Sequence, residues 1–293
     1  MHKSGFVNII GNPNVGKSTL MNALVGEKLS IITSKAQTTR HRIMGIVSGE
    51  DFQIVYSDTP GILKPSYKLQ ESMMKFVTGA VTDADVILYV TDTVEQGDRS
   101  AESIGRIRES GIPTVVVINK IDLSTPEALD ALVDKWRQEL PEAQIVPASA
   151  KENFNIEGLF KTILALLPEG PAFYPKETLT DKTLRFFASE IIREKILKFY
   201  DKEIPYCCEI EIDSYREEPT IDRIAATIYV ARDSQKGILI GHKGEKLKRV
   251  GQTAREDMEE FLGKKVFLQL FVKVSDDWRN NERQLRRFGY ELE

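Results

Sequence analysis

The first half of the chain alternates between two hydrophobic patterns. Short, mostly apolar runs of strand length occupy residues 6–10, 52–56, 86–90, 114–118 and 145–148. Apolar residues recur at helical spacing over residues 67–80, 101–109, 126–140 and 155–167. Runs without polar alternation are typical of strands buried on both faces. Their alternation with helices predicts an α/β fold, with a mostly parallel sheet and helices on both faces. A turn at 48–51 joins β-rich residues 43–47 to 52–56 as a hairpin.

The second half follows a different order. Residues 166–175 contain three prolines and a glycine, which predicts a linker. A long helix over 181–200 follows. The next elements are strands at 206–215 and 223–231, two short helices separated by a glycine-rich turn, a strand at 266–274 and a short final helix. This α-β-β-α-α-β order predicts an α+β domain. We expect an α/β domain at 1–168, a linker at 169–180, and the α+β domain with its C-terminal helix at 181–293. The final helix should pack on that domain's sheet or helix.

Composition narrows the functional classes. With 293 residues, 41% apolar residues, 29% charged residues and a net charge of −4, the chain has no overall basic signature for nucleic acid. Cys207 and Cys208 are adjacent and lack metal-site spacing, so we expect a reducing compartment. The three histidines are scattered and indicate no His-rich metal site. We expect no membrane span, and the short polar segment before residue 6 leaves no room for a signal peptide.

The strongest motif follows the first apolar run. It fits the phosphate-loop pattern G-x-x-x-x-G-K-[ST] and reads Gly11-Asn12-Pro13-Asn14-Val15-Gly16-Lys17-Ser18-Thr19. A strand before it and a helix after it give the context in which backbone N–H groups surround a phosphate. Lys17 would place its charge on the outer phosphates, and the Ser18 hydroxyl would hold Mg²⁺. Without that context, an ordinary glycine turn before a helix would be an alternative.

Residues 58–61 end the 52–56 strand with the sequence Asp-Thr-Pro-Gly. Asp58 in this position can reach Mg²⁺ through a water, and the Gly61 N–H can meet a γ-phosphate. Taken alone, a plain turn would explain the same four residues. Their place after the phosphate loop favours the nucleotide-site interpretation.

Two further strand ends carry candidate base-reading residues. Asp122, in the segment Asn119-Lys120-Ile121-Asp122, can accept hydrogen bonds from both N1–H and the 2-amino group of guanine. Adenine lacks this donor pair, so Asp122 would discriminate between the bases. Asn119 would bond the purine N7 edge or tie the loops together, and the Lys120 stem would lie along the base. In Ser149-Ala150-Lys151, the Ala150 N–H would meet guanine O6.

In this order, the motifs resemble the G domain of translation-factor-related GTPases over residues 5–167. The resemblance makes residues 37–41 part of switch I and residues 58–61 part of switch II. It implies GTP or GDP as ligand, Mg²⁺ held by Ser18, Thr39 and Asp58 with Thr38 as the alternative to Thr39, and catalytic roles for Lys17, Thr39, Gly61 and Asn14. The implied nucleotide contacts are Gly11, Asn12, Pro13, Asn14, Val15, Gly16, Lys17, Ser18, Thr19, Asp58, Thr59, Pro60, Gly61, Asn119, Lys120, Asp122, Ser149, Ala150 and Lys151.

Two positions bear on how such a protein hydrolyses GTP. Ile62 follows Gly61, where many signalling GTPases have a water-positioning Gln, so we expect slow intrinsic hydrolysis. Asn14 stands where potassium-activated relatives of this class use an Asn to help hold K⁺. A role in loop conformation is the alternative for Asn14.

The glycine-rich turn of the second half resembles the loop of a type II KH domain. The matching residues are Ile240-Gly241-His242-Lys243-Gly244, and such a loop lets an RNA backbone pass close beside a groove for about four nucleotides. Residues 180–293 contain equal numbers of acidic and basic residues, but basic residues gather around this loop. A lysine-rich solvated helix face is the alternative. The expected RNA contacts are Lys236, Gly241, His242, Lys243, Gly244, Lys246, Lys248 and Arg249.

A G domain, a proline-containing linker and a KH domain in one chain resemble the Era family of bacterial GTPases. The resemblance extends to Trp278 and Gly289-Tyr290 near the C-terminus. It implies a cytoplasmic, monomeric GTPase that binds small-subunit ribosomal RNA near its 3′ end and assists maturation of the small ribosomal subunit. It also implies peripheral association with the inner membrane. Two rival hypotheses are an ATP-using P-loop enzyme and a GTPase whose C-terminal half binds protein instead of RNA.

Overall fold

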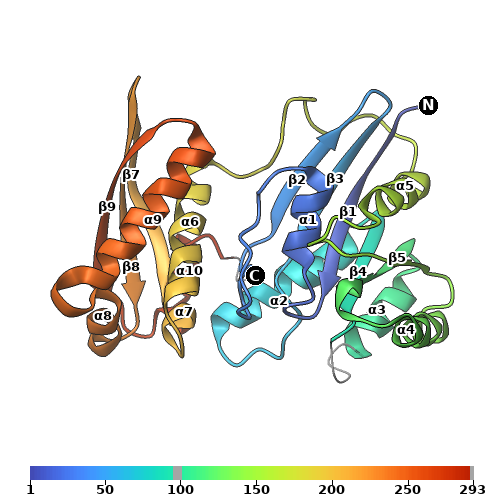
Figure 1. Cartoon of the computed structure of the whole chain (residues 1–293), viewed down its shortest axis with the longest axis horizontal. Helices are drawn as coiled ribbons and strands as arrows, with labels where there is room; N and C mark the ends of the chain where they lie inside the picture. Colours follow the sequence, from blue (N-terminus) through green and yellow to red (C-terminus); the bar gives the residue numbers. More distant parts are fainter. Residues whose placement is uncertain (95–100, 291–293) are drawn as a thin grey trace. The chain divides into compact units, whose positions relative to one another are not determined.

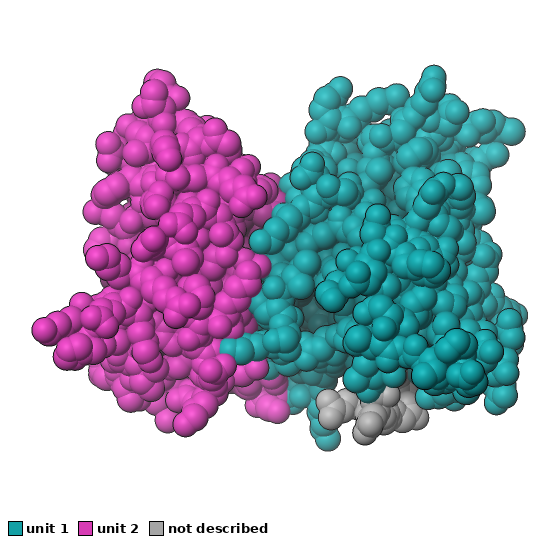
Figure 2. All heavy atoms as spheres, in the orientation of Figure 1, with its two compact units in different colours: residues 1–65, 73–181 teal, residues 66–72, 182–293 magenta. Residues whose placement is uncertain are grey.

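The computed structural model describes residues 1–94 and 101–290. The chain divides into two compact units, shown in different colours in Figure 2. The first comprises Met1–Pro65 and Met73–Asp181, and the second comprises Ser66–Ser72 and Lys182–Glu293. Each unit has its own cluster of buried apolar side chains. None of the described helices is both long and apolar enough to cross a membrane.

The first unit is built on a six-stranded sheet with the strand order β2-β3-β1-β4-β5-β6. Only the β2–β3 pair is antiparallel, as the hairpin pattern predicts. Parallel strands direct their carboxyl ends to one edge of the sheet, where ligands of such folds bind. The strands are β1 (Lys3–Gly11), β2 (Ile43–Ser48), β3 (Phe52–Asp58), β4 (Val86–Asp92), β5 (Thr114–Asn119) and β6 (Gln144–Pro147).

Helices lie on both faces of this sheet (Figure 1). The buried residues of β4 and β5 pack against α2, α3 and α4, with Tyr89 against Trp136 at 5.2 Å between ring centroids. This arrangement confirms the predicted fold class for the first half. The helices are α1 (Lys17–Val25), α2 (Lys68–Thr82), α3 (Ala101–Ser110), α4 (Pro126–Glu139) and α5 (Ile156–Leu166).

The segment after α5 follows the edge of the first unit's sheet. β2 is the edge strand, so its outer backbone groups can accept a further partner. Thr180 Oγ1 donates to the Met44 carbonyl at 2.6 Å, and the Met44 N–H donates to Asp181 Oδ1 at 3.0 Å. The buried carboxamide of Gln53 accepts from two successive N–H groups of the same segment, at 2.7 and 2.9 Å. These residues are therefore fixed to the hairpin that follows switch I.

The second unit has the predicted α-β-β-α-α-β order. Its three-stranded sheet has the order β7-β8-β9, with β7–β8 antiparallel and β8–β9 parallel. Helices α6 and α9 contact the sheet and each other. The elements are α6 (Leu184–Phe199), α7 (Ile204–Cys207), β7 (Glu209–Glu217), β8 (Ile221–Val230), α8 (Asp233–Ile240), α9 (Glu245–Leu262), β9 (Lys265–Val274) and α10 (Glu282–Arg287), with three-residue 3₁₀ turns at His242–Gly244 and Trp278–Asn280. A third such turn, Ile121–Leu123, follows β5 in the first unit.

Two details of this unit differ from the sequence prediction. The first strand begins at Glu209 instead of residue 206, because residues 204–207 form the short helix α7. Pro205 suits the first turn of a helix, where a missing N–H costs nothing. The helix after the glycine turn is also not short, since α9 has 18 residues with Val250, Ala254 and Met258 on its buried face.

The C-terminal segment packs on the β7–β8 side of this sheet, as its apolar stripe predicts. Trp278 is fully buried, and its Nε1–H donates to the Cys207 carbonyl at 2.9 Å. The Tyr290 hydroxyl donates to Glu209 Oε2 at 2.7 Å, which gives that buried carboxylate a partner. The ring of Phe288 lies 5.3 Å from that of Tyr229.

Candidate functional site

The phosphate loop joins β1 to α1 at the carboxyl edge of the sheet. Gly16 has φ 94°, and a Cβ there would lie 2.3 Å from Asn119 Nδ2, so only glycine fits. A Cβ on Gly61 would lie 2.8 Å from Pro13 Cα, so residues 58–61 and the phosphate loop are in close contact. The glycine pattern of the sequence thus corresponds to close backbone packing.

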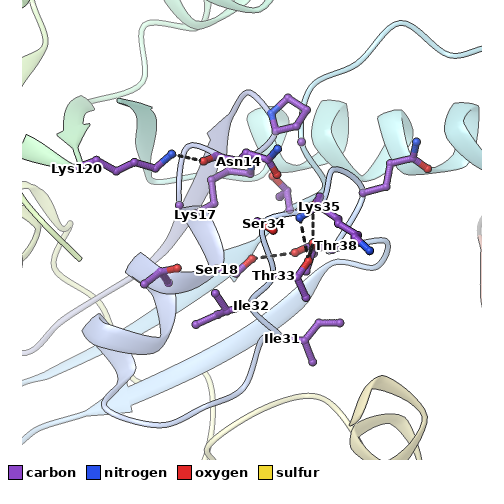
Figure 3. Close-up of a pocket in the computed structure, with 17 residues that line it drawn as sticks. Asn14, Lys17, Ser18, Ile31, Ile32, Thr33, Ser34, Lys35, Thr38 and Lys120 are labelled. Atoms are coloured by element: carbon purple, nitrogen blue, oxygen red, sulfur yellow. Dashed lines mark hydrogen bonds between the residues drawn. The ribbon is translucent and has the colours of Figure 1, made fainter. Parts of the chain in front are cut away.

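Lys17 lies inside the loop, with only 6% of its surface exposed. Its Nζ donates to the carbonyls of Gly11 at 2.9 Å and Asn12 at 2.8 Å. A cavity of about 390 Å³ opens beside it, as Figure 3 shows. Its walls are the phosphate loop, the 31–39 segment and switch II, with the residues Pro13, Asn14, Gly16, Lys17, Ser18, Thr19, Ile31, Ile32, Thr33, Ser34, Lys35, Gln37, Thr38, Thr39, Thr59, Gly61 and Lys120.

Three oxygen-bearing side chains meet beside this cavity. The Ser18 hydroxyl donates to Asp58 Oδ2 at 2.7 Å and lies 2.9 Å from Thr39 Oγ1, which is itself 3.3 Å from the same carboxylate oxygen. Asp58 is fully buried, and burial raises the pKa of its carboxyl above the ordinary value. Its second oxygen, Oδ1, has no hydrogen-bond partner among the described residues. Hard oxygen donors around a buried carboxylate fit a Mg²⁺ ion.

The structure distinguishes the two candidate switch I threonines. Thr38 Oγ1 donates to the Lys35 carbonyl at 2.6 Å and lies 2.6 Å from Thr33 Oγ1, within the loop itself (Figure 3). Thr39 instead points to Ser18 and Asp58. The geometry therefore favours Thr39 for the metal contact.

The loop after β5 is tied to the phosphate loop and to the loop after β6. Asn119 Nδ2 donates to the Val15 carbonyl at 2.8 Å, and its Oδ1 accepts from the Ala150 N–H at 3.0 Å. Of the two roles considered for Asn119, the structure displays the tie between loops. The Ala150 N–H, expected at guanine O6, is bonded to Asn119 in this conformation.

The neighbouring polar side chains are held in defined positions. Asp122 Oδ1 accepts from the buried Ser149 hydroxyl at 2.6 Å. Lys120 donates to the Asn14 carbonyl at 2.6 Å and forms an ion pair with Asp92 at 2.5 Å. Asp92 was not among the predicted site residues, although its position at the carboxyl end of β4 was a usable signal. Asp122 and residues 149–151 do not line the 390 Å³ cavity, which covers the phosphate end of the site.

The glycine turn of the second unit presents an exposed basic loop. Gly241 and Gly244 have φ 73° and 80°, and His242 and Lys243 between them are exposed. A Cβ on Gly241 would lie 2.7 Å from the Lys246 side chain. Such a turn lets another backbone approach closely.

The basic residues around this turn are not equivalent. Arg249 lies over the Phe199 ring at 4.3 Å and Lys246 over the Tyr200 ring at 5.8 Å, so both are held by aromatic neighbours. Lys243 and Lys248 are exposed, and Lys236 is half-buried one turn before the loop. The structure thus brings all eight predicted RNA-contact residues to α8, the turn and the first turns of α9.

The fold and the site together define a class: a P-loop GTPase domain joined to a KH domain. The model of the 50S ribosome-binding GTPase family matches residues 6–120, and the KH domain model matches residues 203–279. These matches cover the phosphate loop, switch II and the segment 119–120 in the first unit, and the glycine turn in the second.

Relatives that match the whole chain narrow this class. The GTPase Era of Alkaliphilus metalliredigens (strain QYMF) is 45% identical over 99% of both chains. That of Staphylococcus haemolyticus (strain JCSC1435) is 45% identical over 99% of this chain and 97% of its own. The chain therefore belongs to the Era family of GTPases.

Solved structures agree with this assignment. Era in complex with MgGDPNP and nucleotides 1506–1542 of 16S ribosomal RNA has a TM-score of 0.95 at 41% identity, covering 100% of both chains. A single-residue variant of Aquifex aeolicus Era, bound to GDP·AlF₄⁻, has a TM-score of 0.94 at 41% identity, covering 99% of this chain and 100% of its own. The predicted family, the two-part fold class and the GTPase activity are confirmed.

Proposed function

We propose that this chain is a GTP-dependent switch that binds small-subunit ribosomal RNA near its 3′ end and assists assembly of the small ribosomal subunit. The observation that carries this proposal is the presence of two complete sites in one chain, a phosphate pocket with a buried carboxylate and an exposed glycine loop with basic neighbours. Support also comes from the Era complex with MgGDPNP and 16S ribosomal RNA, which resembles this chain over its full length. The test compares RNA binding with a GTP analogue and with GDP in wild type and in Lys243→Asp.

The nucleotide site would act mainly by positioning charge. Ser18 and Thr39 would hold Mg²⁺ directly and Asp58 through water, and the ion would neutralise charge on the β- and γ-phosphates. Lys17 would exchange its loop carbonyls for phosphate oxygens, and the Gly61 N–H would meet the γ-phosphate. Ile62 has no polar side-chain atom to orient a water, which supports a slow intrinsic rate.

Replacing Asp58 by Asn tests the metal assignment. We expect hydrolysis to fall by about 100-fold or more, since a preorganised charge at the site is removed. The thermal unfolding temperature of the nucleotide-free protein should not fall, because the substitution removes a buried, desolvated charge. The measurements are GTP turnover against Mg²⁺ concentration and calorimetry, with Asp51→Asn on the exposed 48–51 turn as control. Wild-type magnesium dependence in Asp58→Asn would contradict the assignment.

We also propose that Asn14 helps to hold K⁺ beside the phosphates. Its side chain lines the cavity, and its carbonyl accepts from Lys120 (Figure 3). A cation there would supply positive charge near the γ-phosphate during hydrolysis. However, Asn14 also has φ 66°, a conformation that Asn tolerates well, so a loop role is the competing explanation.

The Asn14→Gly variant separates these two roles, because glycine keeps the positive φ and removes the side chain. We expect wild-type turnover to be about tenfold faster in K⁺ than in Na⁺, equivalent to about 1.4 kcal/mol of transition-state stabilisation. The variant should lose this difference while binding GDP normally. Turnover assays in matched KCl and NaCl buffers decide the question. Retained potassium stimulation in Asn14→Gly would leave only the conformational role.

The proposed route from nucleotide to RNA runs through the hairpin after switch I. Bound GTP and Mg²⁺ would order residues 30–42 and 60–69, and hydrolysis would release them. β2 begins directly after switch I and is bonded at Met44 to Thr180 and Asp181. A shift of β2 would therefore reach the segment that leads into α6. We propose that the chain consists of a GTPase domain at 1–168, a linker at 169–180 and an RNA-binding domain at 181–293. Residues 291–293 of the last domain lie outside the described ranges.

The remaining partner assignments are proposals that rest on the family resemblance. We propose a monomer in the cytoplasm with peripheral association with the inner membrane, which cell fractionation and sedimentation would test. The alternative function, a GTPase whose C-terminal unit binds protein instead of RNA, is favoured by the equal numbers of acidic and basic residues in that half. Loss of RNA binding in Lys243→Asp separates the two.

A further inference from the structure

The glycine turn is too small to account for the whole RNA of the proposed function, on which this inference rests. A KH groove holds about four nucleotides. The Era complex of similar structure contains nucleotides 1506–1542 of 16S ribosomal RNA, a much longer stretch. Any RNA longer than the groove must meet a further surface or leave its remaining bases in solvent.

Two exposed aromatic side chains stand on the outer face of β9. Phe267 and Phe271 are 43% and 50% exposed, although large apolar side chains are usually buried. They lie four residues apart, so they share one face of the strand at a spacing of about 13 Å. Lys265, Gln269 and Lys273 are exposed on the same face. The two rings thus stand separately, with a polar side chain between them and a lysine beyond each.

Within the described residues, the C-terminal segment leaves the β9 side of this sheet open. Phe288 and Trp278 cover the β7–β8 side through ring contacts that include Tyr229. On the β9 side, Arg223 is the register partner of Phe267 and lies over its ring at 5.4 Å. An aromatic ring that already carries a guanidinium on one side resembles the stacking arrangement by which proteins hold single-stranded bases.

The charges near the two rings are partly neutralised. Arg223 pairs with Glu218 at 3.0 Å, and Lys265 pairs with Glu259 at 3.3 Å. Lys273 forms no ion pair within residues 1–94 and 101–290. Asp213 lies nearby, accepting from the Thr227 hydroxyl that is opposite Phe271. With little net charge available, recognition at this face would rest on base stacking, with phosphate attraction secondary.

This face adjoins the glycine-turn surface across a single strand. β9 is an edge strand, and α8 and α9 contact its other side. Leu270, half-buried on that helical side, lies within contact distance of a Cβ built on Gly251 of α9, at 3.4 Å. Phe271 follows Leu270 and points to the opposite face. RNA that leaves the helical side therefore needs to cross only the edge of β9 to reach the rings.

We propose that Phe267 and Phe271 form a stacking platform for unpaired RNA bases that flank the segment held at the glycine turn. A second copy of the chain is the competing occupant, since an edge strand can pair with another strand. Lysines at both ends of β9 and a polar residue between the rings disfavour such pairing. Separated rings also suit two unpaired bases of one strand better than a continuous apolar protein surface.

The test uses the full-length chain with a GTP analogue and fluorescence anisotropy at fixed salt. The short RNA is the smallest oligonucleotide from the small-subunit RNA 3′ region whose binding requires Lys243. The long RNA is the same oligonucleotide with about six unpaired nucleotides added at each end. Wild type should bind the long RNA more tightly. The F267A/F271A double variant should lose about 10- to 100-fold for the long RNA and keep its affinity for the short one.

Two controls and four outcomes make the test decisive. Phe261→Ala removes an equally exposed ring on α9, 42% exposed, and should change neither affinity; F267W/F271W should restore long-RNA binding. Unchanged long-RNA binding in the double alanine variant overturns the platform. Parallel loss of short-RNA binding also overturns it, by showing a general effect on the domain. A wild-type dimer that the double variant abolishes would assign the face to a second copy. If wild type binds no oligonucleotide from the small-subunit RNA 3′ region, so that no short RNA can be defined, the proposed function itself is refuted.

Discussion

The Asp122→Asn variant should lose most of its affinity for GTP and gain affinity for xanthosine triphosphate. The carboxylate of Asp122 can accept from guanine N1–H and from the 2-amino group. A carboxamide keeps one acceptor but presents an N–H to that amino group, so one hydrogen bond becomes a clash of donors. Xanthine carries a carbonyl oxygen at the same position and restores the pair. We expect about 100- to 1,000-fold weaker GTP binding, since hydrogen bonds to charged groups contribute about 1.5–3 kcal/mol each.

The structure indicates that this substitution leaves the loop in place. The Ser149 hydroxyl donates to Asp122 Oδ1 at 2.6 Å, and an Asn carbonyl oxygen accepts the same bond. Titration of fluorescent GDP and xanthosine diphosphate measures the exchange, with Asp130→Asn on the exposed surface of α4 as an isosteric control. Competition by ADP against wild type should be negligible. A variant that still prefers guanine would show that Asp122 does not read the base. Effective competition by ADP would support the rival hypothesis of an ATP-using enzyme.

Motifs at strand ends were predictable from sequence because local rules determine them. Gly16 needs no side chain, and Asp58 and Asn119 each end an apolar run. A parallel sheet then brings such ends to one edge, whatever the details of packing. The same reasoning located the turn at Gly241 and Gly244, where positive φ angles require glycine.

Contacts between residues distant in sequence were not predictable in this way. The ion pair of Lys120 with Asp92 depends on the β4–β5 register, which hydrophobic periodicity does not specify. Gln53 lies in a mostly apolar strand. Its carboxamide accepts hydrogen bonds from the N–H groups of residues 173 and 174, which are distant in the sequence. Nothing in the sequence around Glu209 indicates that it is buried and accepts a hydrogen bond from Tyr290. In each case the partner lies many residues away, and single-sequence patterns carry no information about the pairing.

The Lys243→Asp variant should lose most of the RNA affinity of the KH unit. Lys243 is exposed at the centre of the glycine turn, with φ 48°, and the turn holds its backbone where an RNA phosphate would pass. Substituting Asp changes the local charge by two and places a carboxylate against that phosphate. We expect binding to weaken by about 100-fold at moderate salt and the salt dependence to become shallower, because fewer counterions are released. Anisotropy titrations of RNA from the small-subunit 3′ end, at several salt concentrations, provide both quantities.

The same titrations, run with a GTP analogue and then with GDP, test whether the two halves are coupled. A nucleotide can change the RNA affinity only if it binds the two arrangements of the chain with different affinities. The change in RNA affinity cannot exceed that difference. Tighter RNA binding with the analogue in wild type, absent in Lys243→Asp, supports the route through β2 and Thr180. Equal affinity in both states leaves two working sites without a switch. Lys161→Asp on α5 is the charge-matched control and should bind as wild type does. If Lys243→Asp binds RNA normally, the glycine turn is not the RNA site, and the protein-partner alternative becomes the stronger one.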